Sequence, residues 1–208
     1  NHLIGNVSHE LRTPLTSIMG EADVALSIPR SNEHYQETLQ IILNEAEKLD
    51  KKIKALLMIA QTGFDGKIQK MDKVRMDQLL WDVIETATRI NAKNNVFMDI
   101  SMLPDNPKKL KVQGNEQLLH LAMANIINNG CKYSNFQQVK VSLGATDDHV
   151  YIIIKDSGIG IPDSEMDKIY DPFFRASNTK NYEGYGIGLP LARNIIRIHN
   201  GELIVNSK

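Results

Sequence analysis

The residues best suited to chemistry lie near the start of the 208-residue chain, in the run from Ser8 to Thr16. Apolar residues recur three and four positions apart through this region, which predicts a helix with a seam of the coiled-coil type. They are Ile4, Val7, Leu11, Pro14 and Ile18. His9 lies opposite that seam, where a bulky partner can reach its imidazole as a nucleophile. Thr13 follows one turn later on the same face, and Glu10 places a carboxylate next to the histidine.

The proline at position 14 gives this helix a weak point. Because Pro14 has no N–H, the carbonyl of Glu10 loses its helical partner, and we expect a bend one turn after His9. A zinc-binding helix is excluded, because the position that needs a second histidine holds Thr13. Taken singly, these residues are more typical of a solvated helix surface, and a proline more often marks a helix boundary.

A second group of candidate residues ends a predicted helix in the second half of the chain, between Asn125 and Ser134. Asn125 and Asn129 are one turn apart, so their amides project from one face, and Lys132 follows three residues later. Amide oxygens suit Mg²⁺ and an ammonium group suits phosphate. By itself the segment is more often the polar last turn of a surface helix.

The segment from Asp156 to Pro162 follows the most apolar predicted strand directly. A carboxylate at the end of a buried strand can accept a hydrogen bond from an exocyclic amine such as that of adenine. Gly158 and Gly160 allow the backbone to approach a planar base closely. The same pattern can also form a plain turn.

Two further clusters follow along the chain. The run 171–175 pairs two phenylalanines with Arg175, which alone indicates core packing beside a surface charge. The glycine-rich run 184–190 opens the last predicted helix, and Pro190 suits its first turn. A glycine-rich loop before a helix presents N–H groups to phosphates. The spacing fits neither a dinucleotide-binding fingerprint nor a P-loop.

Two long helices must carry His9. The first runs to about Leu26 and breaks at residues 28–30, and Ser31 or Asn32 can cap the second. The second helix has an unbroken heptad pattern. It consists of Tyr35, Leu39, Ile42, Ala46, Leu49, Ile53, Leu56 and Ala60. The short connection predicts an antiparallel hairpin, and we expect two copies to form a dimeric four-helix bundle. The alternative is a hairpin that packs on its own globular domain.

The rest of the chain mixes strands and helices without a regular βαβ order. The predicted elements are a helix capped by Asp77 and ending near Ile90, strands at 96–101 and 110–112, a helix from Asn115 to about Lys132, strands at 139–143 and 150–154, a helix after Gly188 and a strand at 202–205. This order predicts an α/β sandwich with helices on one face of a mixed sheet.

Composition excludes several classes of protein. The net charge of −1 gives no indication of nucleic-acid binding, and a single cysteine, Cys131, excludes an internal disulfide framework. The longest aliphatic or aromatic run, 150–154, is too short to span a membrane. The chain starts without methionine and already inside a helical pattern, so we interpret it as a fragment of something longer.

The run Ser-His-Glu-Leu-Arg-Thr-Pro-Leu closely resembles the phosphoacceptor box of sensor histidine kinases. The four later clusters resemble, in order, the N, G1, F and G2 boxes of the histidine-kinase ATP-binding domain, a Bergerat or GHKL fold shared with gyrase and Hsp90-type ATPases. The resemblance covers essentially the whole chain. It implies a dimerisation and phosphotransfer domain at 1–62, a linker at 63–72 and a catalytic domain at 73–208.

The resemblance also implies roles for individual residues. Asn129 is expected to hold Mg²⁺ with Asn125 close by, and Asp156 to bind the adenine amine of ATP. Residues from about 172 to 186 are expected to form a mobile lid over ATP. The other residues expected to contact nucleotide are Lys132, Tyr133, Gly158, Gly160, Ile161, Phe174, Arg175, Gly184, Tyr185, Gly186, Ile187, Gly188 and Leu189.

The implied reaction is autophosphorylation of His9 by ATP, with Glu10 as general base, followed by transfer to an aspartate of a response-regulator receiver domain. Thr13 is expected to orient water when the same surface dephosphorylates that receiver. The family further implies a cytoplasmic location and a parent protein anchored in the membrane through segments outside this chain. No nucleic-acid partner is expected.

The sequence departs from the common family pattern at Gly130, Tyr185 and Pro190, and Tyr185 affects the expected lid geometry most. It also stops at Lys208, where such domains usually continue into a further strand. Two alternatives remain. An ATPase or chaperone of the same fold has no use for the His9 box, whereas an idle dimerisation scaffold has no need of Asn129 or Asp156.

Overall fold

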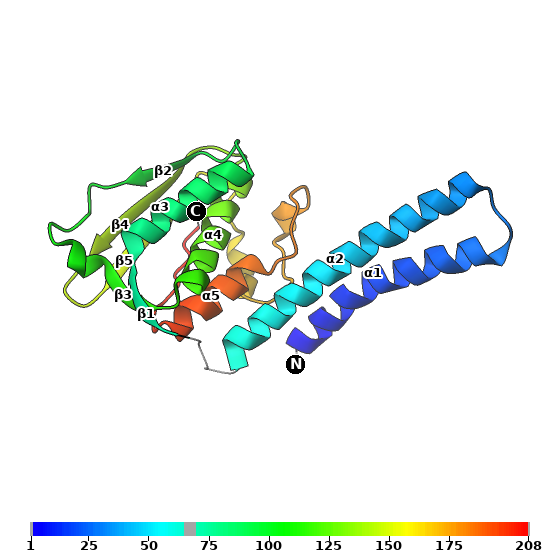
Figure 1. The fold of residues 1–208 in the computed structure, drawn as a ribbon, viewed down its shortest axis with the longest axis horizontal. Helices are drawn as coiled ribbons and strands as arrows, with labels where there is room; N and C mark the ends of the chain where they lie inside the picture. The colour runs from blue at the N-terminus through cyan, green and yellow to red at the C-terminus, as the bar shows by residue number, and fades with distance from the viewer. Residues whose placement is uncertain (1, 65–69, 208) are drawn as a thin grey trace.

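A computed structural model describes residues 2–64 and 70–207 and begins with a long helical hairpin (Figure 1). Helix α1 spans His2–Ser27 and helix α2 spans Asn32–Phe64. The hydroxyl oxygen of Ser31 accepts a hydrogen bond from the backbone N–H of His34 at 3.3 Å, so Ser31 is the cap of α2. The hairpin and its capping residue were therefore predicted correctly.

Pro14 lies inside α1 without ending it. The proline is buried, and the carbonyl oxygen of Glu10, which loses its helical donor there, accepts a hydrogen bond from the ammonium of Lys52 at 3.0 Å. A side chain from α2 thus replaces the missing backbone donor, and α1 continues to Ser27. Of the predicted linker near Gly63 and Gly66, residues 65–69 lie outside the described part of the chain.

A mixed α/β domain follows the hairpin. Its elements are β1 (Asp72–Arg75), α3 (Met76–Ile90), β2 (Val96–Asp99), η1 (Pro107–Leu110), β3 (Lys111–Gly114), α4 (Glu116–Tyr133), β4 (Val139–Ala145), β5 (Val150–Lys155), η2 (Asp163–Lys168), η3 (Ser177–Thr179) and α5 (Gly188–Ile198). Strand β4 pairs in parallel with β2 and antiparallel with β5, while β1 and β3 form a separate antiparallel pair. The mixed sheet was predicted correctly.

The core lies between this sheet and the three helices α3, α4 and α5, which cover one of its faces (Figure 1). Alternate residues of β5 explain why only one face is covered, because Ile152 and Ile154 pack against the core while Tyr151 and Ile153 are exposed. The largest fully buried side chains come from both layers. They are Leu80, Ile127, Leu143, Ile195, Val83, Val139, Val141 and Cys131.

Four predicted details are wrong. Asp77 does not cap α3, because its carboxylate pairs with the guanidinium of Arg75, whose Nε lies 2.9 Å from Oδ1. The strand expected at 110–112 begins at Lys111, since Leu110 ends a 3₁₀ turn. The strand expected at 96–101 ends at Asp99, because the Asp99 carboxylate accepts a hydrogen bond from the N–H of Ser101 and the chain turns there.

Residues 202–205 are not in a strand, because their backbone pairs with no strand among the described residues. The expected alternation is still present, with Leu203 and Val205 half-buried and Ile204 exposed. This segment is held by single hydrogen bonds, such as that from the Tyr170 hydroxyl to the Leu203 carbonyl at 3.2 Å.

The sequence also gave no indication of β1. Within residues 2–64 and 70–207, no helix has the length and apolar character needed to cross a membrane.

Candidate functional site

The loop after β5 is shaped around the carboxylate of Asp156. Its Oδ1 accepts a hydrogen bond from the N–H of Gly158 at 2.8 Å, and the N–H of Ile159 donates to the carbonyl of Tyr133 at 3.1 Å. A Cβ at position 158 would lie 2.7 Å from that Oδ1 and 2.9 Å from the Tyr133 carbonyl oxygen, so only glycine fits. Asp156 itself is exposed and can present its carboxylate to a ligand.

Helix α4 brings the predicted amide residues to the start of α5. Asn125 donates from its side-chain nitrogen to the carbonyl of Leu121 at 2.9 Å, which leaves its Oδ1 directed at Gly188. A Cβ on Gly188 would lie 2.8 Å from that oxygen. Asn129 is half-buried one turn later on the same helix. The two predicted glycine and asparagine clusters are therefore in direct contact.

The segment before α5 is folded by backbone conformations that need glycine. Gly186 has φ +69°, and a Cβ there would lie close to the carbonyl groups of Phe173 and Phe174. The N–H of Phe173 donates to the carbonyl of Gly186 at 2.9 Å, which joins the two ends of the loop. Phe173 is buried and also has a positive φ, of 67°. Residues 173 and 186 thus form the base of the predicted lid.

Cationic side chains hold the lid through its backbone carbonyl groups. The ammonium of Lys132 donates to the carbonyl of Glu183 at 3.0 Å. The guanidinium of Arg175 donates to the carbonyl of Thr179 at 2.6 Å and also to that of Tyr182. Lys132 and Arg175, the two cations predicted to lie at the phosphates, therefore both donate hydrogen bonds to carbonyl groups of the lid.

The lid also contacts the loop that carries Asp156. The amide nitrogen of Asn178 donates to the carbonyl of Gly160 at 3.0 Å, and the Tyr182 ring meets the Tyr133 ring edge-on with centroids 5.2 Å apart. Lys132 lies over that same Tyr133 ring, with its nitrogen 4.2 Å from the centroid. The predicted nucleotide residues of α4, the β5 loop and the lid are thus assembled in one place.

His9 lies on the exposed face of α1, as predicted. The hydroxyl of Thr13 donates to the His9 carbonyl at 3.1 Å, so Thr13 interacts with the backbone of its own helix. The carboxylate of Glu10 is turned away to α2, where its Oε2 lies 2.8 Å from the ammonium of Lys52. Contact between Glu10 and the His9 ring therefore requires a change of side-chain conformation.

A groove of about 620 Å³ separates this face of the hairpin from the lid. One wall comes from the hairpin, and the other comes from the segment before α5, which lies beside α2 (Figure 1). The lining residues are His9, Glu10, Thr13, Pro14, Glu45, Lys48, Lys52, Phe173, Phe174, Arg175, Gly184 and Tyr185. The structure therefore brings the two parts of the predicted site to opposite sides of one groove.

The donors near the lid fit Mg²⁺ that is bound mainly by a nucleotide. Asn125 and Asn129 offer amide oxygens, and no group of three or more His, Cys, Asp or Glu residues within the described ranges could hold a metal alone. Mg²⁺ typically takes one or two protein oxygens and completes its coordination with phosphates and water. The residues present match that pattern.

Burial distinguishes the free cysteine from the reactive groups. Cys131 is buried on α4, and this burial raises the pKa of its thiol, which keeps the thiol protonated and unreactive.

At the groove, the hydrogen bond to Glu45 raises the pKa of Lys48 and keeps that lysine charged. Near His9 the groove thus contains two lysines of α2, each paired with a carboxylate.

Sequence reasoning missed the residues of α2 that face His9. Lys48 and Lys52 are one turn apart and Glu45 precedes them, so all three reach the groove from one side of the helix. Their helical spacing is visible in the sequence, but a charged stripe beside a heptad seam usually faces solvent. Asn178 and Tyr182 were also missed, because a loop of polar residues gives no periodic signal.

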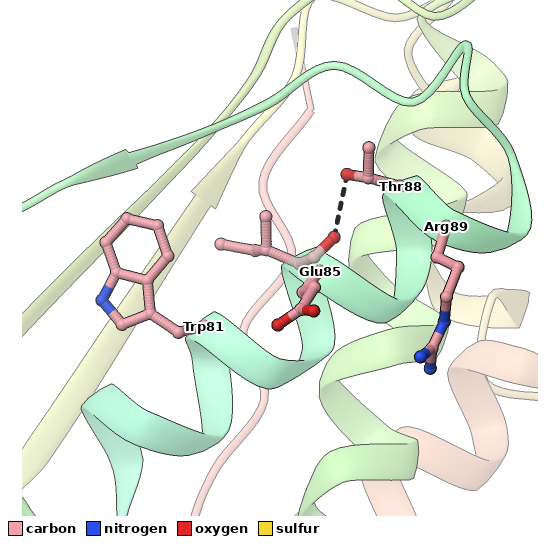
Figure 2. A pocket seen from close by; sticks show the side chains of 5 residues that line it. Trp81, Glu85, Thr88 and Arg89 are labelled. Atoms are coloured by element: carbon pink, nitrogen blue, oxygen red, sulfur yellow. Dashed lines mark hydrogen bonds between the residues drawn. The ribbon is translucent and has the colours of Figure 1, made fainter.

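A second concavity, of about 560 Å³, lies on the outer side of α3 (Figure 2). It is lined by Trp81, Ile84, Glu85, Thr88 and Arg89. Figure 2 shows these side chains along one helix, with the Thr88 hydroxyl donating to the Ile84 carbonyl at 2.9 Å. It contains none of the residues predicted to act in chemistry, so the groove beside His9 is the candidate site.

Fold and site together define an ATP-binding α/β domain joined to a helical hairpin that carries an exposed histidine. Residues 1–63 match the His Kinase A (phospho-acceptor) domain. Residues 114–208 match the family of histidine kinase-, DNA gyrase B- and HSP90-like ATPases.

Relatives match along the whole chain. It is 29% identical over 214 residues to the sensor histidine kinase AtsR of Burkholderia thailandensis, covering 100% of this chain and 35% of that protein. It is 29% identical over 209 residues to the heme sensor protein HssS of Staphylococcus saprophyticus, covering 100% of this chain and 44% of that protein. The chain thus spans less than half the length of these relatives.

A solved structure of histidine kinase ThkA in complex with the response regulator protein TrrA has the same fold, with a TM-score of 0.68 and 21% identity. The match covers 100% of this chain and 59% of that one. The chain thus carries a phosphoacceptor domain and an ATP-binding domain of the kinds that these two models describe, the combination expected of a sensor histidine kinase of a two-component system.

Proposed function

We propose that this chain phosphorylates His9 with the γ-phosphoryl group of ATP. The observation that carries the proposal is the shared groove, in which His9 faces the lid residues Arg175, Gly184 and Tyr185. Phosphoryl transfer depends mainly on positioning and on stabilisation of charge. The groove supports the positioning, because its hairpin wall carries His9 and its other wall carries the lid residues that we assign to the nucleotide.

The chemistry follows from the groups on the two walls. A ring nitrogen of neutral His9 attacks the γ-phosphorus, the bond to the bridging oxygen breaks, and ADP leaves. Glu10 accepts the proton from the other ring nitrogen after it turns from Lys52 to the imidazole. Mg²⁺, held by Asn129 with Asn125 close by, would offset charge on the phosphates. Lys132 would exchange the Glu183 carbonyl for a phosphate oxygen.

The adenine of ATP would lie at the β5 loop. Asp156 would accept the hydrogen bond of the exocyclic amine, and Gly158, Gly160 and Ile161 would border the base. Tyr133, the lid residue Phe174, and Ile187 and Leu189 at the start of α5 would enclose the nucleotide. The tight backbone packing at Gly158 supports this assignment, because it fixes the direction of the Asp156 carboxylate.

We also propose that two copies pair through residues 1–62. Large apolar side chains remain exposed along both helices of a single hairpin, which favours burial against a second hairpin. They include Leu15, Met19, Val24, Leu39, Leu43, Ile53 and Leu57. Several of these lie on the predicted heptad seam or beside it.

The phosphoryl group would pass from His9 to an aspartate of a response-regulator receiver domain. The kinase of similar fold, ThkA, was solved in complex with a response regulator, TrrA, which supports this class of partner. Thr13 would orient water when the same surface of the hairpin dephosphorylates the receiver. Since ATP and receiver domains are cytoplasmic, this portion would work in the cytoplasm, anchored through segments outside it.

The alternatives explain fewer of the residues. A plain ATPase of this fold would not need His9, Glu10 and Thr13 on the groove. An idle scaffold would not need Gly186 at φ +69° or the close contact of Gly188 with Asn125. The kinase accounts for both walls of the groove.

The test is incubation of the purified protein with γ-labelled ATP and Mg²⁺. We expect label that is labile to acid and stable to base, and loss of that label in His9→Gln. The matched control is His149→Gln, an exposed histidine at the turn between β4 and β5, which should label normally. Acid-stable label, or label that persists in His9→Gln, would contradict the proposal.

A further inference from the structure

Lys52 makes two contacts with Glu10 through a single nitrogen. Its Nζ lies 3.0 Å from the Glu10 backbone carbonyl and 2.8 Å from the carboxylate oxygen Oε2. The carbonyl is the one that Pro14 deprives of a helical donor. Lys52 therefore completes the helical turn after His9 and fixes the neighbouring carboxylate at the same time.

This lysine differs from the other lysines of α2 in its burial. The Lys52 side chain is only 12% exposed, whereas Lys54 is 74% exposed and pairs with Asp50 on the helix surface. Burying an ammonium group is unfavourable unless acceptors surround it. Glu10 supplies both the charge and a second acceptor, so Lys52 is bound to one place.

The lid contacts the same ammonium group from the other wall of the groove. The Nζ of Lys52 lies 5.8 Å from the centroid of the Tyr185 ring, within the range of a cation–π contact. Tyr185 lies directly between Gly184 and Gly186, the two lid glycines with positive φ. A change in the lid therefore changes the surroundings of Lys52.

We infer that Lys52 is a positioning residue for phosphorylation of His9, and that Tyr185 couples it to the lid. Lys52 does not touch the phosphorus or the imidazole. It acts through the backbone carbonyl of Glu10, by completing the helical turn that follows His9. This inference rests on the proposed function, because it concerns the rate of the same reaction.

A neutral side chain of similar length cannot replace Lys52. In Lys52→Met the Glu10 carbonyl loses its donor, so the helical turn that follows His9 is no longer held. Positioning of reacting groups accounts for a large share of the rate in such reactions. Lys52→Arg keeps a cation and several N–H donors within reach of both oxygens.

The experiment compares the initial rate of His9 labelling against ATP concentration in Lys52→Met, Lys52→Arg and the control Lys54→Met. We expect kcat to fall about tenfold or more in Lys52→Met, while KM for ATP changes by less than about twofold. Lys52→Arg should lose less: the fall in log kcat should be at most half of the fall seen in Lys52→Met. Lys54→Met should match the unmodified protein.

Three outcomes would overturn the inference: Lys52→Met equal to Lys54→Met, a rise in kcat, or a loss confined to KM. If the unmodified protein fails to label His9, the proposed function itself is wrong, which separates the two failures.

A double-mutant cycle with Tyr185→Leu keeps the inference testable when a single variant is poorly folded. Circular dichroism and thermal unfolding first establish which variants are folded. In the folded variants, the effects of Tyr185→Leu and Lys52→Met on kcat should be non-additive, because the two side chains are in contact. Additive effects would show that Tyr185 does not act through Lys52.

Discussion

Gly188 lies so close to Asn125 that a single methyl group at position 188 would reach within 2.8 Å of the asparagine Oδ1. Gly188 is the first residue of α5, and Asn125 lies on α4 near the proposed metal-binding asparagine, Asn129. This contact joins the start of the lid-bearing helix to the amide cluster.

Gly188→Ala should therefore weaken ATP binding. The added Cβ must displace either Asn125 or the first turn of α5, and we expect the Kd for ATP to rise about tenfold. The control is Gly20→Ala on α1, where nothing lies within 4 Å of the new Cβ. Titration calorimetry measures both, and equal affinities in the two variants would contradict the assignment.

Lys132→Met should weaken ATP binding and loosen the lid together. The ammonium that we assign to phosphate also donates to the Glu183 carbonyl, so its loss removes both interactions. We expect a Kd for ATP about tenfold higher and faster hydrogen exchange in residues 176–185, measured without nucleotide. Lys180→Met, an exposed lysine of the lid, should leave both quantities unchanged.

Asp156→Asn should reduce ATP affinity while preserving the fold. The asparagine Oδ1 can still accept from the Gly158 N–H, but the new amide nitrogen cannot accept a hydrogen bond from adenine. We expect a loss of about tenfold or more in affinity, measured by displacement of a fluorescent ATP analogue. The exposed Asp163→Asn is the matched control, and an equal loss there would argue against an adenine contact at Asp156.

Acid should destabilise the catalytic domain through Asp99. The ion pair with Lys140, at 2.7 Å, and the N–H of Ser101 lower the pKa of Asp99 well below its usual range. Because the folded pKa is depressed, this stabilisation is present above the unfolded pKa of about 3.9 and is lost as the pH falls through the folded value.

The free energy of unfolding of Asp99→Asn should therefore lie below that of the unmodified protein at neutral pH. Denaturant titrations should show the gap narrowing as the pH falls to about 3. A gap that stays constant with pH would show that the ion pair does not contribute.

The periodic elements and most of the nucleotide site could be predicted from sequence, because both depend on local patterns. The heptads of α2, the Asn115 cap of α4 and the alternation of β5 each follow from residues close in sequence. The glycine-rich runs were informative for the same reason, since backbone conformations such as that of Gly186 admit few other residues.

What could not be predicted depends on contacts between distant segments. Lys52 reaches Glu10 across 42 positions of the chain, and nothing in the local pattern identifies it. Asp77 was expected to cap a helix, but the neighbouring Arg75 binds its carboxylate instead. Residues 202–205 alternate like a strand, and alternation alone does not supply a pairing partner.

Mapping the phosphorylated residue tests the central claim most directly. The protein is incubated with ATP and Mg²⁺, digested at neutral pH to preserve phosphohistidine, and analysed by mass spectrometry with fragmentation of the labelled peptides. We expect phosphate on His9, in a quantity that falls to background in Asn129→Asp. Phosphate on another residue, or an unmodified His9 in protein that binds ATP and Mg²⁺, would contradict it.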